Sequence, residues 1–528
     1  MKYRILLLLL TFSTLGFADK EKPKDKEKPN VVLIMVDDLN DYVGFLGGHP
    51  QTKTPAMDKL ANRSVIFTNA FSNDPICNPS RASFSTGLYP HTTHFFGFNK
   101  FLKNETLMGS KTMFEHFKDN GYTTVGIGKL LHTNINTVWN AYGDQSDFGP
   151  FPYDGEKKRV HPSVPAPFNK AGALDGGYAS LKDIPTVNGV TGWFDKVKGW
   201  PKLEVKPFKY INDEDRDLMP DEVKVEDAKK FIKKFENENT EKPFFLGVGF
   251  NRPHTPLYVP QKYFDMFPLA DIKLPETGGQ AELEGALYGK VKEGNHGKRG
   301  YDHFKYLVEG YHNDRDLALR TYIQAYLACI AFVDDQIADV IQAIEDSKFA
   351  DNTVIVLVSD HAYNMGDKDY LYKFALWDKS TRIPMLVHNP GQKKAIKVKQ
   401  PVSLIDIYPT LIDLCSLEGS TIKDENGKSL DGHSMVPLYS KNTKQKWQGP
   451  DFALSAISGG MGDKFIEKQH YSIRTEQYRY IRYADGQEEL YDHATDPNEF
   501  SNVAKQEKYM SVVTELSQKL NKQIGITN

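Results

Sequence analysis

Cysteine is scarce in this sequence, which has three in 528 residues, at positions 77, 329 and 415. Three thiols cannot build the disulfide framework that holds small secreted domains together. Cys329 lies in an apolar pattern of helical spacing and Cys415 lies between leucines, so both are predicted to be core residues. Cys77 is the one that lies in a segment suited to chemistry.

The sequence also lacks an excess of positive charge. Its 66 lysines and arginines against 69 acidic residues give a net charge of −3, which argues against nucleic acid as the main partner. No internal repeat is visible. A chain of this length is too long for one core, so we expect two domains.

A hydrophobic run long enough to cross a membrane is missing at the start of the chain. Met1–Arg4 is basic, the apolar run Ile5–Leu10 is short, and the small residues Gly16 and Ala18 follow. This order is typical of a secretory signal peptide, predicted here as residues 1–18. No cysteine follows it, so we expect an exported protein, periplasmic or secreted, with no stable membrane anchor. Residues 19–29 are predicted to form a charged linker.

Cys77 opens the segment Cys77-Asn-Pro-Ser-Arg81. Pro79 fixes its own backbone angle φ, and Ser80 is predicted to cap the start of a helix. A helix N-terminus behind the thiol favours negative charge there. Arg81 adds a permanent cation that can bind an oxyanion with two donors.

Two continuous apolar segments, 30–36 and 353–358, are typical of buried parallel strands. Each is followed by polar residues, namely Asp37, Asp38, Asp360 and His361. Ligands of parallel α/β sheets bind at the carboxyl ends of strands. If the two strands are neighbours, these side chains form an oxygen-rich site suited to Ca²⁺ or Mg²⁺ rather than zinc.

Two further predicted strands, 122–128 and 244–250, also end in polar residues. Lys129 and His132 follow the first strand, and His254 follows the second. Each of these alone is more simply explained as a surface or capping residue. Four strands that all deliver polar groups favour a common site.

The remaining pattern predicts two domains of unequal size. We expect a large domain over 30–440 and a small domain of sheet plus helix over 441–528. The expected elements are a helix over 109–121, a long helix over 321–347, a strand over 381–387, strands within 470–483 and 488–492, and a helix over 505–522. Residues 134–220 are predicted to be loops over the active-site face.

The segment Cys77-x-Pro-x-Arg81, with Gly87 beyond it, resembles the signature of type I sulfatases. The resemblance extends from Asn30 to about Asn502. Within the family the sequence is most similar to the iduronate-2-sulfatase branch, on the segments Gly128–His132 and Asn251–Pro256 and on Lys373.

This resemblance implies an α/β fold like that of alkaline phosphatase, with a large mixed sheet between helices and a smaller C-terminal domain of sheet and helix. It implies that a maturation enzyme converts Cys77 to Cα-formylglycine, whose hydrate attacks sulfur. The implied ligands of a calcium ion are Asp37, Asp38, Asp360, His361 and the modified Cys77. The implied catalytic residues are Cys77, Arg81, Lys129, His132, His254 and Lys373, with Lys129, His254, Lys373 and His94 in contact with substrate. His254 is the expected acid for the leaving oxygen, and His132 the expected base.

The function expected from the resemblance is hydrolysis of sulfate monoesters of a sulfated oligosaccharide or polysaccharide. One alternative is a phosphatase or phosphonate monoester hydrolase of the same superfamily. Another is a non-catalytic protein that binds sulfated glycans. Candidate sugar contacts in the loops are His91, His94, Asn99 and Trp377.

Overall fold

The computed structural model describes residues 28–133, 135–145, 147–197, 204–238, 242–290, 296–440, 445–460 and 462–526. The predicted signal peptide and nearly all of the linker lie outside these ranges. No helix within them is both long and apolar enough to cross a membrane.

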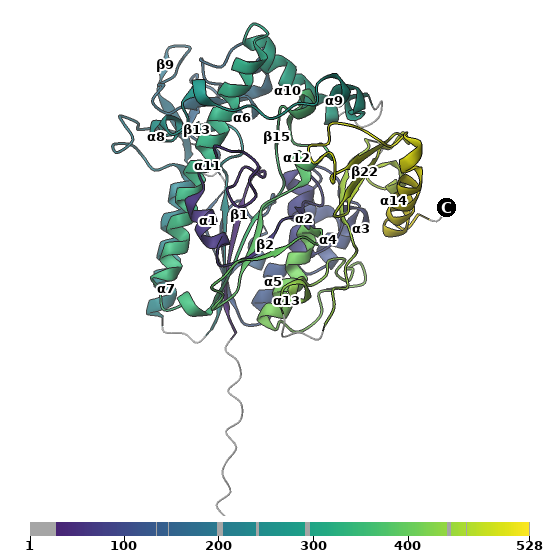
Figure 1. Cartoon of the computed structure of the whole chain (residues 1–528). Helices are drawn as coiled ribbons and strands as arrows, with labels where there is room; N and C mark the ends of the chain where they lie inside the picture. The colour runs from purple at the N-terminus through teal and green to yellow at the C-terminus, as the bar shows by residue number, and fades with distance from the viewer. Residues whose placement is uncertain are drawn as a thin grey trace, which may run out of the picture.

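A mixed sheet of eight strands lies at the centre of the structure (Figure 1). Its order is β18 (Ile396–Val398), β2 (Val65–Phe67), β17 (Met385–His388), β14 (Thr353–Ser359), β1 (Asn30–Val36), β12 (Phe244–Phe250), β4 (Thr123–Gly128) and β5 (Ala141–Gln145). Strand β1 is parallel to both of its neighbours, β12 and β14. All three are buried along their whole length, as their continuous apolar sequences predict.

Helices cover both faces of this sheet, and β1 shows why. Its residues alternate between two cores, because successive side chains of a strand point to opposite faces. Val32, Ile34 and Val36 belong to the core that includes α7 (Pro220–Asn237) and α11 (Arg315–Glu345). Val31, Leu33 and Met35 belong to the core that includes α5 (Met113–Asp119) and α13 (Ile407–Cys415). The fold class is therefore α/β, with a large mixed sheet between two layers of helices, as expected.

A second, antiparallel sheet lies in the C-terminal region. Its strands are β20 (Ala453–Ile457), β21 (His470–Arg474), β22 (Tyr478–Arg482) and β23 (Glu488–Asp492). Helix α14 (Met510–Gln523) packs on it through Leu516 and Leu520. This matches the predicted sheet plus helix, while the boundary at residue 441 stays a prediction.

Several element boundaries differ from the predicted ones. The long helix begins at Arg315, where the Asp314 side chain accepts a hydrogen bond from Leu317 N at 3.0 Å. The strand predicted over 381–387 begins only at Met385, because Thr381 is the last residue of helix α12 (Asp378–Thr381) and residues 382–384 connect this helix to β17. The predicted loops over 134–220 contain strands that their short, irregular sequences did not reveal, such as β5, β10 (Trp193–Val197) and β11 (Glu204–Phe208). Cys329 and Cys415 are buried in the core, as predicted.

Candidate active site

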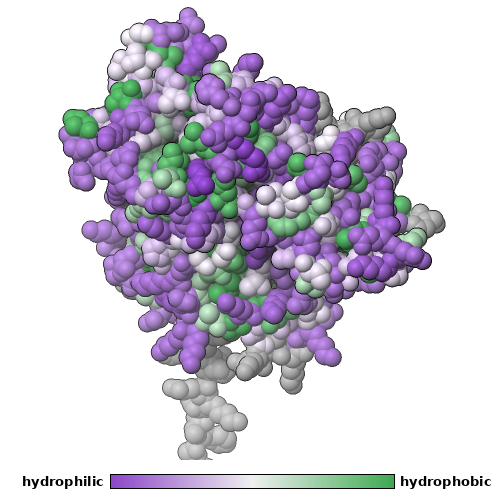
Figure 2. Space-filling model, turned by 45° about the horizontal axis from the view of Figure 1, so that its top comes forward, coloured by the Kyte–Doolittle hydropathy of each residue, from purple (hydrophilic) through white to green (hydrophobic). Residues whose placement is uncertain are grey.

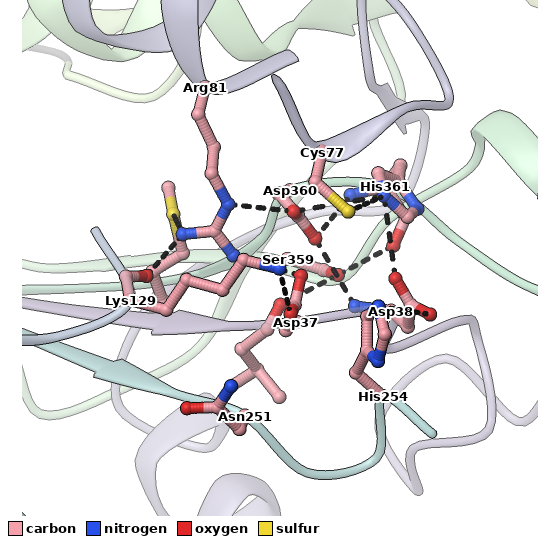
Figure 3. A network of polar contacts seen from close by, with 12 residues as sticks. Asp37, Asp38, Cys77, Arg81, Lys129, Asn251, His254, Ser359, Asp360 and His361 are labelled. Atoms are coloured by element: carbon pink, nitrogen blue, oxygen red, sulfur yellow. Dashed lines mark hydrogen bonds and ion pairs between the residues drawn. The ribbon is translucent and has the colours of Figure 1, made fainter. Parts of the chain in front are cut away.

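The carboxyl ends of four adjacent strands meet at one polar centre (Figure 3). Strand β1 is followed by Asp37 and Asp38, β14 by Asp360 and His361, β12 by the loop of His254, and β4 by Lys129. Each strand's ladder continues one residue further: Asp37 N donates to Phe250 O, Asp360 N to Val36 O and Lys129 N to Gly249 O. The main chains that carry these polar side chains are thus fixed by the sheet.

The turn after β1 is held from two sides. Asp38 has a φ of +61°, a conformation that is uncommon for a residue with a side chain. The Tyr326 hydroxyl donates to Asp38 O at 2.7 Å, and Ser359 Oγ accepts from Leu39 N at 3.1 Å. These contacts stabilise the unusual turn and direct the Asp38 carboxylate into the centre.

Cys77 is the first residue of helix α2 (Cys77–Thr86). The prediction that Ser80 caps this helix was wrong, since the flanking residue is Ile76. Pro79 does not delay the start of the helix, because the amide it lacks would have had no partner within the first turn. Ser80 Oγ instead donates to the main-chain oxygen of Asp360. Helix α2 therefore places its N-terminus and the thiol directly against the end of β14.

Arg81 is fully buried and ties the carboxylates together. Its Nε donates to Asp360 Oδ2 at 2.9 Å and its Nη2 to Asp37 Oδ1 at 3.1 Å. Its Nη1 contacts Met35 Sδ and the main-chain oxygens of Lys129 and Leu130. Burial raises the pKa of Asp37, but Lys129 and Arg81 hold it well below its usual value. These contacts suit Arg81 to positioning the carboxylates rather than to gripping an oxyanion with both arms.

Two lysines reach the same centre. Lys373 Nζ lies 2.9 Å from Asp38 Oδ1 and 3.2 Å from Cys77 Sγ. Lys129 Nζ lies 2.5 Å from Asp37 Oδ2. Burial lowers the pKa of Lys373, but the Asp38 carboxylate outweighs this and raises it well above the usual value. Lys373 is therefore charged beside the Cys77 sulfur.

Two histidines present one nitrogen each to the centre. His361 Nδ1 donates to the main-chain oxygen of Ala362 at 3.0 Å, which leaves Nε2 facing Cys77 Sγ at 3.3 Å. His254 Nδ1 likewise donates to Thr255 O at 2.6 Å. Because a carbonyl oxygen can only accept, both Nδ1 atoms carry hydrogen. Burial lowers the pKa of His254 well below its usual value, and Lys373 lowers it further.

His132 is exposed and lies close enough to the centre for the charges of Lys129 and Arg81 to act on its ring. The protein around the ring and the positive charges of Lys129 and Arg81 lower its pKa to about 4. Its imidazole is therefore neutral near pH 7 and able to accept a proton.

The donor atoms fit a divalent cation. One group of side chains comprises Asp37, Cys77, Asp360 and His361, and a second comprises Asp37, Asp38, Cys77 and His254, each with its ligand atoms within 4.8 Å of one another. Burial raises the pKa of Asp38 to about 7 despite the nearby lysine. A cation among these carboxylates would stabilise their charged forms and so offset the effect of burial. Their hard oxygens suit Ca²⁺. His361 would contribute Nε2 to this set, because its Nδ1 is bonded to the main chain.

Two of the candidate sugar contacts lie elsewhere. Trp377 is buried, and its Nε1 donates to Glu489 at 2.8 Å, so its indole cannot contact a sugar. His91 is also buried and stacks on Tyr89 with 5.0 Å between ring centroids. The sequence shows that Trp377 and His91 are near the predicted motifs, but it does not show which residues bury them.

The other two lie on the surface beside the site. His94 and Asn99 are both exposed, and both contact Asp463 of the C-terminal region. Their role as substrate contacts stays a prediction.

Some residues of the site were missed by sequence reasoning. Tyr326 and Ser359 hold the turn of Asp38, and the Phe148 ring packs 5.1 Å from Lys129 Nζ and 4.8 Å from the His254 ring. Tyr326 was visible as part of a helical apolar stripe and Ser359 as the end of a strand. No local signal showed that either would contact residues about 300 positions away.

A model of the family described as Sulfatase matches residues 29–417, more than half of the chain. The chain belongs to the sulfatase family. It is thus a sulfuric ester hydrolase. A second model, described as N-sulphoglucosamine sulphohydrolase, C-terminal, matches residues 366–525 of this sulfatase.

Curated relatives support the same assignment. A protein named Sulfatase from Formosa agariphila is 32% identical to this sulfatase, over 99% of the chain and 92% of the relative. An Ulvan-active sulfatase from the same organism is 28% identical over 99% of the chain and 87% of the relative. Iduronate 2-sulfatase of Mus musculus is 28% identical over 74% of the chain and 69% of the relative. The expected similarity to iduronate 2-sulfatases is confirmed.

Among solved structures, the phosphonate monoester hydrolase of Agrobacterium radiobacter has the same fold. It has a TM-score of 0.65 and 23% identity over 94% of this chain and 95% of its own.

Proposed function

We propose that this sulfatase is exported and removes sulfate from monoesters of a sulfated glycan, using formylglycine made from Cys77 and a bound calcium ion. The observation that carries the proposal is the position of Cys77 Sγ, within 3.3 Å of both Lys373 and His361 and beside three buried carboxylates. The names of the Formosa and mouse relatives support a sulfated sugar as the substrate class.

The two groups that complete the site would supply a nucleophile and a Lewis acid. A hydrated aldehyde at position 77 would supply the attacking hydroxyl, which a thiol cannot replace. Calcium held by Asp37, Asp38, Asp360 and His361 would withdraw charge from the sulfate oxygens.

The lysines bind and orient the anionic head of the substrate. Lys129 directly follows β4 and contacts Asp37, while Lys373 directly follows β16 (Leu371–Tyr372) and contacts Asp38. A preorganised pair of cations in a buried site stabilises the negative charge that develops on the sulfate oxygens in the transition state. Arg81 keeps Asp37 and Asp360 in place while this happens.

The two histidines transfer protons, His254 to the leaving oxygen and His132 from position 77. His254 directs Nε2 into the site and gives a proton to the leaving sugar oxygen after the anionic substrate has favoured proton uptake. His132, which is neutral near pH 7, would accept a proton from the hydrated aldehyde that Cys77 would carry after conversion. The pKa of about 4 of His132 in the free protein agrees with a base rather than an acid.

The first experiment is peptide mass spectrometry on Cys77, with protein from a host that contains a formylglycine-generating enzyme. We expect the mass of formylglycine at position 77 and release of inorganic sulfate from a panel of sulfated saccharides. Cys77→Ala should abolish release. Cys415→Ala, which alters another buried thiol in α13, should leave it unchanged.

A phosphonate monoester and an aryl phosphate in the same panel separate the proposal from its enzymatic alternative. If the phosphonate monoester or the aryl phosphate is cleaved faster than every sulfate ester, a sulfate ester is not the preferred substrate and the proposal is refuted. Tight binding of sulfated glycans by an unmodified thiol protein without turnover would instead favour the glycan-binding alternative.

A further inference from the structure

An exposed phenyl ring stands at the mouth of the site. Phe98 has 58% of its surface accessible, although most phenylalanines of the described residues are buried. Its ring centroid lies 5.6 Å from that of His132 and 6.3 Å from that of Phe374. Phe374 directly follows Lys373, whose ammonium contacts the Cys77 sulfur. Phe98 therefore borders the path by which a substrate reaches the nucleophile.

The loop that carries Phe98 is fastened on both sides of the ring. Asn78 Nδ2 donates to Gly97 O at 2.7 Å and to Asn99 O at 2.9 Å. Asn78 is the residue next to Cys77 in helix α2, so the loop is tied to the start of the catalytic helix. On the outer side, the Asn99 side chain donates to Asp463. The exposure of Phe98 thus belongs to a pinned loop, and the ring is held ready for contact.

The chemistry of the surroundings indicates what covers the ring. The interior of the site is built of buried cations and carboxylates, which suit the sulfate group but not a hydrocarbon surface. The alcohol part of the ester must extend outward from Cys77, past the neighbouring rings of His132 and Phe98. The C–H face of a pyranose ring is apolar and flat enough to pack on an aromatic ring, while its hydroxyls point to the rim. Figure 2 shows hydrophobic patches within a mainly hydrophilic surface on the face that it displays.

We infer that Phe98 is a stacking platform for the sugar ring that bears the sulfate ester, an inference that rests on the proposed function. The platform sets specificity, because it binds the ring and not the sulfate. A ligand with no ring, such as inorganic sulfate, gains nothing from it.

The test compares Phe98→Ala with Phe98→Trp, using the sulfated saccharide that the wild type cleaves fastest. Loss of the aromatic face should raise KM by about tenfold, the factor that corresponds to roughly 1.4 kcal/mol, with a smaller change in kcat. Phe98→Trp should keep KM within about threefold of the wild type. Product inhibition by inorganic sulfate should be unchanged in both variants. Met510→Ala, which removes another exposed apolar side chain on the outer helix α14, serves as the control.

The outcomes distinguish a failure of the stacking role of Phe98 from a failure of the proposed function. An unchanged KM in Phe98→Ala, with normal turnover by the wild type, refutes the platform and leaves the proposed function intact. Equal weakening of sulfate inhibition and of saccharide binding also refutes it, because the variant would then have disturbed the anion site. A wild type with confirmed formylglycine that releases no sulfate from any saccharide overturns both.

Discussion

Arg479 joins the C-terminal sheet to the segment that carries Lys373, and replacing it with methionine should destabilise the protein. The guanidinium is buried in β22. Its Nη2 donates to Asp378 Oδ1 at 2.8 Å, its Nη1 donates to Leu376 O at 2.8 Å, and its Nε lies 2.6 Å from Glu499 Oε1. Methionine fills similar space but leaves two buried carboxylates without their main cation.

The size of the effect follows from the contacts that remain. Removing one partner of a buried ion pair costs about 3–5 kcal/mol. Asp378 would keep Arg474, whose Nε is 3.3 Å away, and Glu499 would keep His493 at 3.0 Å. We therefore expect Arg479→Met to lower the free energy of unfolding by about 3 kcal/mol, the lower end of that range.

Urea unfolding followed by tryptophan fluorescence measures this difference. Arg482→Met is the matched control, because Arg482 is in the same strand, is only half-buried and contacts Asn521 alone among the hydrogen bonds described for it. The control should lose less than about 1 kcal/mol. Adding Glu499→Gln to Arg479→Met should restore part of the stability, since one uncompensated charge is removed. Equal midpoints for Arg479→Met and Arg482→Met would refute the reasoning.

The same residues should also affect catalysis. Asp378 lies five positions after Lys373 (378 − 373 = 5). Loss of the Arg479 contacts with this segment is therefore expected to move the Lys373 ammonium that contacts Cys77. We expect kcat/KM of Arg479→Met to fall under conditions where the variant is still folded. An unchanged kcat/KM would mean that the short segment from 374 to 377 holds Lys373 by itself.

Two further predictions concern the metal and acid. Removal of calcium with a chelator should abolish sulfate release and lower the midpoint of thermal unfolding, because Asp37, Asp38 and Asp360 are buried together; full activity in protein shown by elemental analysis to contain no metal would contradict this. Burial raises the pKa values of Asp378 and Glu499, but Arg479 holds both below their usual values. The two carboxylates therefore contribute fully to stability above the usual carboxyl range. This contribution is lost as the pH falls through the lowered pKa values. Unfolding free energy should therefore drop more steeply between about pH 5 and pH 3 in the wild type than in Arg479→Met; parallel pH curves would contradict the assignment.

The sequence alone was enough to predict the central strands and the polar residues that follow them. Residues 244–250 form a strand with the predicted bounds, and the strands of Asp37 and Asp360 are neighbours, as expected. These predictions succeeded because a continuous apolar run is typical of a strand buried on both faces. In addition, parallel strands bring the residues beyond their carboxyl ends to one edge of a sheet.

The tertiary structure alone decided which partner each polar or aromatic side chain meets. Trp377 was predicted as a sugar contact but donates to Glu489 inside the protein, while Phe98, which no sequence pattern singled out, is exposed beside His132. Arg81 lies four positions after Cys77 in the chain (81 − 77 = 4), yet it donates to Asp37 and Asp360. Local sequence patterns report whether a segment is buried, but a contact between residues hundreds of positions apart exists only after the sheets and helices have packed.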